Sequence, residues 1–232
     1  MSSTNGSQYL ISYKNLRSII GALGVLLFVV PLIYGFTQPK LLESISASYY
    51  TPVRNVFVGA LCVLGMFLIA YRGYDLLDTV ITNVAGVCTI LVAFCPTARP
   101  APAPQSFVNH IHPIAASAAF VLLAVMALQF TQSAATDNSM GAVLRRLGAA
   151  AIYRFPRTDD PARNGENITY VTCAWIIVLS IGVALASVIP LFWPEAFMLT
   201  AFGLSWTVKG GTLPRAQQAL KRAVATPQSA QA

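Results

Sequence analysis

The chain has 232 residues, of which 56% are hydrophobic and only 10% are charged. Soluble domains carry roughly 25% charged residues, so this composition excludes an ordinary soluble protein and indicates that lipid surrounds most of the chain. The net charge of +7 comes without zinc-ligand pairs, an RNP motif or heptads, so we predict no nucleic-acid partner. The four cysteines lie in apolar runs, where we expect buried thiols and no disulfide framework.

Six apolar runs follow one another along the chain. The first covers residues 19–36, and its eighteen residues at about 1.5 Å each span roughly 27 Å, close to the hydrocarbon thickness of a bilayer. The sequence therefore predicts an all-α fold, a polytopic transmembrane helical bundle with six spans inside a domain of residues 18–212. The expected spans are residues 19–36, 55–72, 79–96, 108–130, 169–189 and 192–209.

Three segments lie outside the predicted spans. Residues 1–17 form a polar N-terminal segment, and the tail of residues 213–232 is rich in Ala, Gln and Lys/Arg, which predicts disorder. Residues 131–167 form the longest connection. Within it, residues 143–154 fit a short basic amphipathic helix on an anionic leaflet, and a solvated loop that only satisfies topology is the alternative.

The Lys and Arg residues divide unevenly between the two sides of the predicted bundle. With the N terminus inside, three lie in outer segments, namely Lys40, Arg54 and Arg99. The other twelve lie in inner segments: Lys14, Arg17, Arg72, Arg145, Arg146, Arg154, Arg157, Arg163, Lys209, Arg215, Lys221 and Arg222. Because cytoplasmic segments carry an excess of Lys and Arg, both termini are predicted to be cytoplasmic.

Polar side chains gather on the predicted outer side. They come from the first outer loop, the start of the fourth span and the turn between the last two spans, and in a compact bundle these segments can meet in one pocket. A polar group in hydrocarbon needs a partner, because leaving it unpaired costs several kcal/mol. The predicted ligand-binding residues are Ser44, Ser46, Tyr50, Arg54, Asn55, His112 and Glu195.

Arg54 and Glu195 lie at the outer ends of their spans and are candidates for an ion pair. In the structural alternative, Arg54 reaches the lipid headgroups along its apolar stem. In the functional alternative, its forked guanidinium binds a lipid phosphate or a substrate carboxylate.

His110 and His112 are the only histidines of the chain. Their spacing points them to opposite faces of a helix but to one side of an extended chain, and Pro113 favours an extended His112. With Glu43 or Glu195 as a third ligand, the pair would form an open zinc site that activates water. The alternative is a hydrogen-bonded interfacial histidine that helps to start a helix.

Ser46 and His112 are the catalytic candidates, because a serine nucleophile needs a base within hydrogen-bond reach and His112 is the suitable one. Apart from zinc, no cofactor is expected. No charged residue falls in the middle of a predicted span and no internal repeat is visible, and both observations argue against a transporter.

Five stretches resemble a widespread group of bacterial six-span membrane proteins that is labelled as a domain of unknown function. They are SISASYYTPVRNVFVG at residues 44–59, YRGY at 71–74, Ile111-His112, the pattern N-x-x-Y-x-x-C at 167–173, and FWPE through SWTVKG at 192–210. The resemblance covers nearly the whole chain except the tail and the inner loop, and it departs at Ala174 and Pro194. It implies a multi-pass protein of the bacterial cytoplasmic (inner) membrane.

The first outer loop is also similar to that of the FRAG/DRAM/Sfk group of eukaryotic six-span proteins, which carries an Ile-Ser motif before a proline. This similarity implies lipid handling, including the remodelling of lipid anchors, and the matching positions are Ser44, Ser46, Pro52 and Arg54.

The leading hypothesis from the sequence is a membrane protein that binds or senses a lipid or other amphiphile through an outer polar pocket. A membrane-embedded lipid hydrolase or lipid-modifying enzyme is the alternative, and a small transporter is the third reading. The expected partners are membrane lipids, with a second copy of the chain or another membrane protein also compatible.

Overall fold

The computed structural model describes residues 4–73, 76–98, 106–131, 140–154 and 159–211, and every regular element in these ranges is helical. The predicted all-α class is therefore confirmed. The elements are α1 (Thr4–Phe36), the short 3-10 helix η1 (Ser46–Tyr50), α2 (Arg54–Ala70), α3 (Leu76–Phe94), α4 (Phe107–Gln129), α5 (Met140–Ala151), α6 (Pro161–Ala186) and α7 (Phe192–Lys209).

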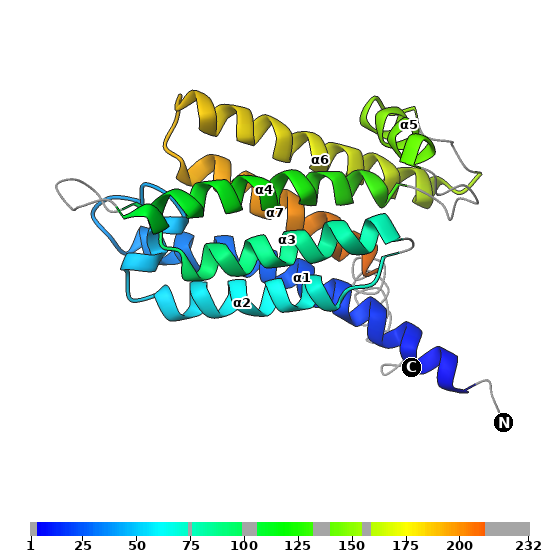
Figure 1. Ribbon diagram of the computed structural model, residues 1–232, viewed down its shortest axis with the longest axis horizontal. Helices are drawn as coiled ribbons and strands as arrows, with labels where there is room; N and C mark the ends of the chain where they lie inside the picture. Colours follow the sequence, from blue (N-terminus) through cyan, green and yellow to red (C-terminus); the bar gives the residue numbers. More distant parts are fainter. Residues whose placement is uncertain (1–3, 74–75, 99–105, 132–139, 155–158, 212–232) are drawn as a thin grey trace, which may run out of the picture.

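The long helices form a closed ring. Along the chain, α1 packs on α2, α2 on α3, α3 on α4, α4 on α6 and α6 on α7, and α7 closes the ring by packing on α1. These helices run alongside one another in alternating directions, whereas α5 lies across that direction at one end of the bundle, beside α6 (Figure 1). The ring encloses the core, so a site in the bundle is built from the inward faces of several helices.

Four helices in the described part of the chain are long and apolar enough to cross a membrane: Tyr13–Phe36 of α1, α3, α4 and α6. α2 is also apolar but has 17 residues. Large apolar side chains stay exposed along the bundle, and Leu76, Phe107 and Leu185 each keep more than three quarters of their surface. Apolar surface on this scale suits lipid better than water. These features indicate a membrane protein; the count of six spans and the side of the termini remain predictions.

The helices extend beyond several predicted spans. α1 begins at Thr4, so the polar N-terminal segment continues the first helix, and α6 begins at Pro161, inside the predicted inner loop. The start of α6 has a local cause: Asp160 caps it by accepting a hydrogen bond from the Ala162 amide at 2.9 Å, and proline suits the first helical position. The tail of residues 213–232 lies outside the described residues.

Of the two alternatives for residues 143–154, the structure shows the helix, as α5, which begins and ends three residues earlier than expected. It docks on α6, because the Trp175 indole N–H donates to the Ala151 carbonyl at 2.7 Å and the Tyr153 hydroxyl lies 3.1 Å from the Thr172 hydroxyl. Leu144 and Arg145 remain exposed. Whether this helix lies on a lipid leaflet remains a prediction.

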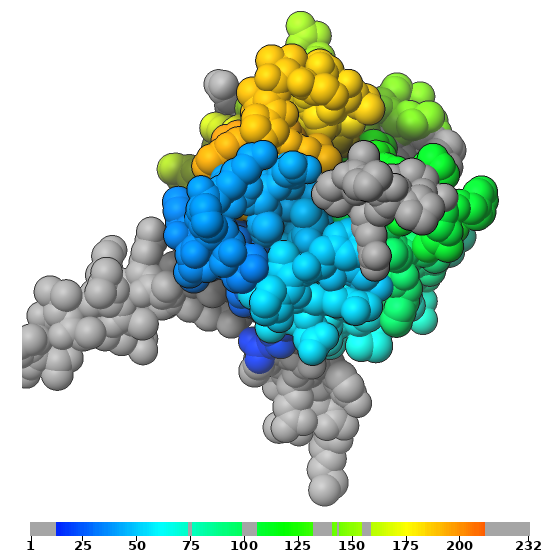
Figure 2. Space-filling view, turned by 90° about the vertical axis from the view of Figure 1, so that its left-hand side faces the viewer, coloured from blue at the N-terminus to red at the C-terminus, as the bar shows by residue number. Residues whose placement is uncertain are grey.

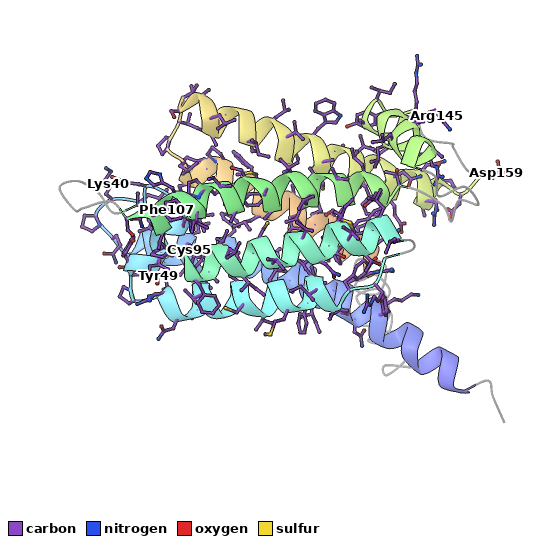
Figure 3. The ribbon with its side chains drawn as sticks, in the orientation of Figure 1. Lys40, Tyr49, Cys95, Phe107, Arg145 and Asp159 are labelled. Atoms are coloured by element: carbon purple, nitrogen blue, oxygen red, sulfur yellow. The ribbon has the colours of Figure 1, made fainter. Side chains whose placement is uncertain are left out.

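The two ends of the bundle differ in their contents, and we name each after one element. The η1 end holds η1, the α3–α4 connection and the α6–α7 turn, and Figure 3 places Tyr49, Cys95 and Phe107 there. Figure 2 shows this end, with the segment between α1 and α2 lying beside the start of α7. The Trp206 end is built around fully buried Trp206 in the last turn of α7. Arg145 and Asp159 lie toward that end (Figure 3).

Candidate functional site

Glu195, in the first turn of α7, is the centre of the polar contacts at the η1 end. Its Oε2 accepts hydrogen bonds from the backbone N–H groups of Ile45 at 2.5 Å and Ser46 at 3.2 Å, and its Oε1 accepts one from the Ser46 hydroxyl at 3.0 Å. The Phe192 amide donates to the Glu43 carbonyl at 3.0 Å, so the start of α7 and the first loop are joined at two points. Of the outer polar residues that could meet in one pocket, Ser46 and Glu195 are thus brought together.

The loop is shaped by its own serines before it reaches Glu195. The Ser44 hydroxyl accepts a hydrogen bond from the Ala47 amide at 3.0 Å, and this local turn begins η1. Ser44, Ser46 and Ser48 are buried, and Ile45 is 2% exposed. The SIS motif therefore directs the amides of Ile45 and Ser46 toward α7 while the Ile45 side chain enters the core.

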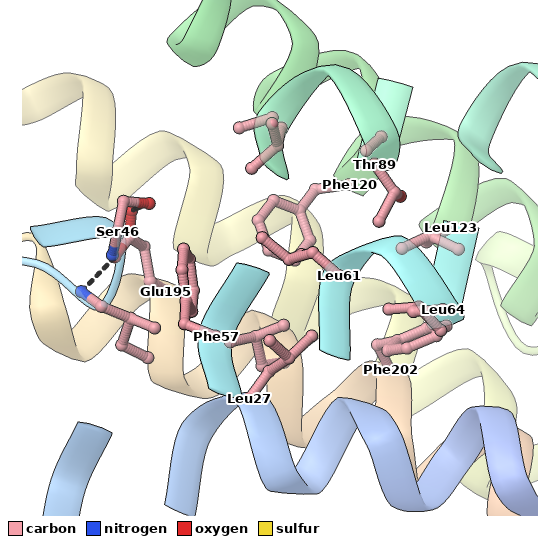
Figure 4. Close-up of a pocket in the computed structure, with 15 residues that line it drawn as sticks. Leu27, Ser46, Phe57, Leu61, Leu64, Thr89, Phe120, Leu123, Glu195 and Phe202 are labelled. Carbon is pink, nitrogen blue, oxygen red and sulfur yellow. Dashed lines mark hydrogen bonds between the residues drawn. The ribbon is translucent and has the colours of Figure 1, made fainter. Parts of the chain in front are cut away.

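A cavity of about 60 Å³ lies in the bundle next to Ser46 and Glu195 (Figure 4). Thr89 is its other polar residue, and the Thr89 hydroxyl is already bonded to the Ala85 carbonyl at 2.8 Å. A water-sized sphere needs about 10–15 Å³, so the space holds roughly four to six groups of that size. The apolar lining consists of Leu27, Ile45, Phe57, Leu61, Leu64, Val92, Ala116, Ala119, Phe120, Leu123, Leu199 and Phe202.

A second polar cluster holds the backbone carbonyls of residues 95–97. His112 Nδ1 lies 2.7 Å from the first carbonyl, the Asn109 amide donates to the second and third at 3.0 and 3.2 Å, and the Tyr50 hydroxyl donates to the third at 2.6 Å. Because a carbonyl only accepts, Nδ1 is the protonated nitrogen of His112. These side chains fix the α3–α4 connection and tie η1 to it.

The extended alternative for His110 and His112 is wrong, and the other alternative, a hydrogen-bonded histidine near the start of a helix, is found for His112. Both histidines lie in α4, where the Asn109 side chain accepts from the Ser106 amide at 2.8 Å and secures the helix start. Pro113 falls in the second turn, and apolar helices tolerate proline when neighbouring groups satisfy the freed backbone. His112 is therefore buried and His110 exposed, on different faces of one helix.

The residues expected to bind zinc are not brought together. His110 and His112 diverge, and exposed Glu43 pairs with Lys40 at 3.7 Å. Among the described residues, no group of three His, Cys, Asp or Glu side chains is placed to hold a metal ion. Zinc therefore stays a prediction without a ligand set in that part of the chain.

The candidate ion pair between Arg54 and Glu195 is not formed. The Arg54 guanidinium lies 4.2 Å from the centre of the Tyr49 ring and donates to the Tyr49 hydroxyl at 2.8 Å. Glu195 is already engaged by three donors from the loop. Arg54 and Asn55 are exposed at the start of α2, so neither joins the Ser46–Glu195 contact.

The catalytic pair of Ser46 and His112 is not formed either. The Ser46 hydroxyl donates to Glu195, and His112 Nδ1 contacts the Cys95 carbonyl. His112 Nε2 is buried and finds no hydrogen-bond partner among the described residues. The serine and the histidine therefore belong to two clusters at the same end of the bundle.

The apolar lining of the cavity was missed by sequence reasoning that followed polar residues, although helical spacing marks it. On α2 the lining residues are Phe57, Leu61 and Leu64, and on α7 Leu199 and Phe202 follow Glu195 by four and seven positions. Such i, i+4, i+7 spacing places each set on one helix face. No pattern in the sequence marks the carbonyls of residues 95–97 as acceptors.

The fold and its exposed apolar surface indicate a helical membrane protein with a small internal cavity that is polar at one end. No family model matches the chain, and neither the curated proteins nor the solved structures yield a match.

Proposed function

We propose that this protein binds a lipid or another amphiphile, with the polar group at Ser46 and Glu195 and an apolar segment in the adjoining cavity. The observation that carries the proposal is the cavity, whose lining is apolar except for Thr89 and for Ser46 and Glu195 at one end. Small-molecule sites are commonly concave and mostly apolar, with a few placed polar groups.

The size of the cavity limits the apolar part of the ligand. A space of about 60 Å³ accepts a short segment of chain, not a whole lipid. Leaving a cavity of this size empty costs roughly 1.4 kcal/mol, at about 24 cal/mol per Å³. Filling it therefore favours binding only modestly, and in a membrane the apolar segment gains little by leaving lipid. The polar contact must supply much of the affinity.

Native mass spectrometry of the purified protein tests the proposal. We expect the natural chain to retain an amphiphile, and Ala119→Leu to lose it, because Ala119 lines the cavity and leucine places three more carbons there. Ala118→Leu is the matched control, since this neighbour on α4 is half-buried and does not line the cavity. Retention by both variants, or by neither, would contradict the proposal.

We also propose a multi-pass arrangement in a bacterial cytoplasmic membrane, with six spans and both termini on the cytoplasmic side. The twelve-to-three division of Lys and Arg supports it. Alkaline phosphatase fused after residue 103 should be active and fused after residue 160 inactive. The reverse pattern would overturn the orientation.

The hydrolase and transporter hypotheses have no specific observation in their favour. The hydrolase requires Ser46 or a zinc-bound water to act with His112, and these groups lie in separate clusters. Metal analysis on the mass spectrometry sample covers this alternative, because the hydrolase predicts a stoichiometric zinc that His112→Ala loses.

A further inference from the structure

Glu195 is a partly buried carboxylate held only by neutral donors. Its partners are two backbone amides and one hydroxyl, all from Ile45 and Ser46. No Lys, Arg or His of the described residues comes within ion-pair distance of it. Removing an ionised carboxylate from water is costly unless a cation or enough hydrogen bonds compensate, so a cation placed beside Glu195 would stabilise its ionised form.

The geometry leaves one acceptor position open beside the cavity. A carboxylate offers about four lone-pair sites, and here Oε2 accepts two hydrogen bonds while Oε1 accepts only that of the Ser46 hydroxyl. Glu195 itself lines the cavity, so a ligand there can reach this carboxylate. A group that only accepts hydrogen bonds, such as a phosphate or a carboxylate, would be repelled.

We infer that the site takes an amphiphile whose polar head is a protonated amine, with the ammonium on Glu195 and a short alkyl segment in the cavity. This inference rests on the proposed function and adds the chemical class of the head. An alkyl ammonium carries charge and donors and stays protonated at neutral pH. Its hydrogen bond to a carboxylate is charge-assisted and about twice as strong as a neutral one.

Calorimetric titration of the natural chain in phosphatidylcholine nanodiscs, with hexylamine and hexan-1-ol as probes, tests the inference. The two probes share six carbons, which suits the size of the cavity, and differ in the head. We expect hexylamine to bind about tenfold more tightly, because hydrogen bonds to charged groups exceed neutral ones by roughly 1 to 1.5 kcal/mol. Empty nanodiscs and Ala119→Leu correct for partition into lipid.

Glu195→Gln is the deciding variant, because it keeps the size and one acceptor oxygen but removes the charge. It should bind the two probes within twofold of each other, while Ala118→Leu, which changes neither the cavity lining nor the carboxylate, should retain the preference for the amine. If Glu195→Gln does not fold, the comparison of the two probes on the natural chain still decides the question.

The outcomes separate this inference from the proposed function. Equal binding of both probes, abolished by Ala119→Leu, would overturn the ammonium head and leave the amphiphile site standing. Binding that Ala119→Leu does not change would overturn both. Arg99 lies outside the described residues, so the preference for the amine is also measured in Arg99→Gln. A preference that is present in this variant and absent from the natural chain would overturn the inference for the natural chain.

The source of the ammonium is resolved by the composition of the nanodisc. If the head belongs to an amphiphile in the membrane, a long-chain amine such as octadecylamine added to the phosphatidylcholine nanodisc should compete and weaken the apparent affinity for hexylamine. If the ligand is a free amine, the affinity should be the same with and without octadecylamine. Either result supports an ammonium head on Glu195.

Discussion

The two ends of the bundle use the same helix α7 in opposite ways. At the Trp206 end, the buried indole of Trp206 lies edge-on to the rings of Tyr71 and Phe130, with centroids 5.0 and 5.2 Å apart, and Phe130 contacts Tyr170 in the same manner. At the η1 end, the same helix presents Glu195 to a loop and to a cavity of about 60 Å³. One end is filled with aromatic rings and the other contains free space.

The two ends also differ in how their cationic side chains are placed. At the Trp206 end, Lys209 Nζ donates to the Phe130 carbonyl at 3.1 Å and lies 5.2 Å from the centre of the Phe130 ring. At the η1 end, the carboxylate of Glu195 has no cation among the described residues, and Arg54 lies outside on Tyr49. Because close packing of apolar rings stabilises a fold, and a carboxylate without a cation beside free space can accept a ligand, we propose that the first end supplies stability and the second binds.

The largest loss of stability should come from truncating the central aromatic side chain of the Trp206 end. Trp206→Ala removes a fully buried ring that packs against the rings of Tyr71, Phe130 and Phe202, and we expect the free energy of unfolding to fall by about 3 to 5 kcal/mol. Unfolding by SDS titration, followed by circular dichroism, measures this loss. Trp206→Phe should cost less than half as much. A loss below about 1 kcal/mol for alanine would show that this end is not the stable one.

The next effect concerns the attachment of the loop at the η1 end. Glu195→Leu leaves the Ile45 and Ser46 amides without their acceptor, and an unsatisfied buried donor costs about 1 to 3 kcal/mol. We expect about 2 kcal/mol less stability in the same SDS titration and faster proteolysis between α1 and α2. Glu195→Gln retains an acceptor oxygen and should lose less than 1 kcal/mol. Equal losses in both variants would assign the stability to charge alone.

Much of the fold was predictable because composition and period are visible in the sequence. Long apolar runs predicted helices, and each of the six predicted spans overlaps a described helix. The bounds were less accurate where local chemistry decides them. The Asp160 cap and Pro161 start α6 well before its apolar run, and the first helix continues through polar residues to Thr4. Apolar runs indicate which segments are helical, whereas caps decide where those helices begin.

The site was predictable only in part, because a linear sequence does not show which polar groups already have partners. Ser46 and Glu195 do meet, but His112 and Tyr50 are used to hold the carbonyls of residues 95–97, and Arg54 stacks on its neighbour Tyr49. Backbone carbonyls are present at every residue, so nothing in the sequence shows which of them will attract a side chain. The predicted residues therefore divide into Ser46 and Glu195, which line the cavity, and residues that hold other parts of the structure together.

Small-to-large substitutions should change stability less than the two preceding variants. The loss should be larger at a tightly packed position than at a position that lines the cavity. A Cβ on Gly86 would lie 2.6 Å from the Gly65 carbonyl oxygen at the α2–α3 crossing, so Gly86→Ala should cost about 1 to 3 kcal/mol. Ala116 lines the cavity, and Ala116→Val should cost less than about 1 kcal/mol because its methyl groups enter free space. Both are measured by SDS titration, and a larger loss for Ala116→Val would mean that the cavity is not hollow.

The smallest effect compares a cation from each end. Arg54 is exposed, and its contact with the Tyr49 ring is of the kind that contributes about 0.5 to 1 kcal/mol. Lys209 is half-buried, its Nζ lies 5.2 and 5.7 Å from the centres of the Phe130 and Tyr170 rings, and it also bonds a carbonyl, so its contribution should approach about 2 kcal/mol. Replacing each by Met keeps most of the apolar stem and removes the charge.

We therefore expect Lys209→Met to lower stability clearly in the SDS titration and Arg54→Met to lower it by about 0.5 kcal/mol or less. Arg54→Met should also leave hexylamine binding unchanged, because Glu195 and not Arg54 faces the cavity. A marked loss of binding in Arg54→Met would place the ligand's polar head on the guanidinium. The binding chemistry would then be that of an anion, and the assignment of Glu195 would fail.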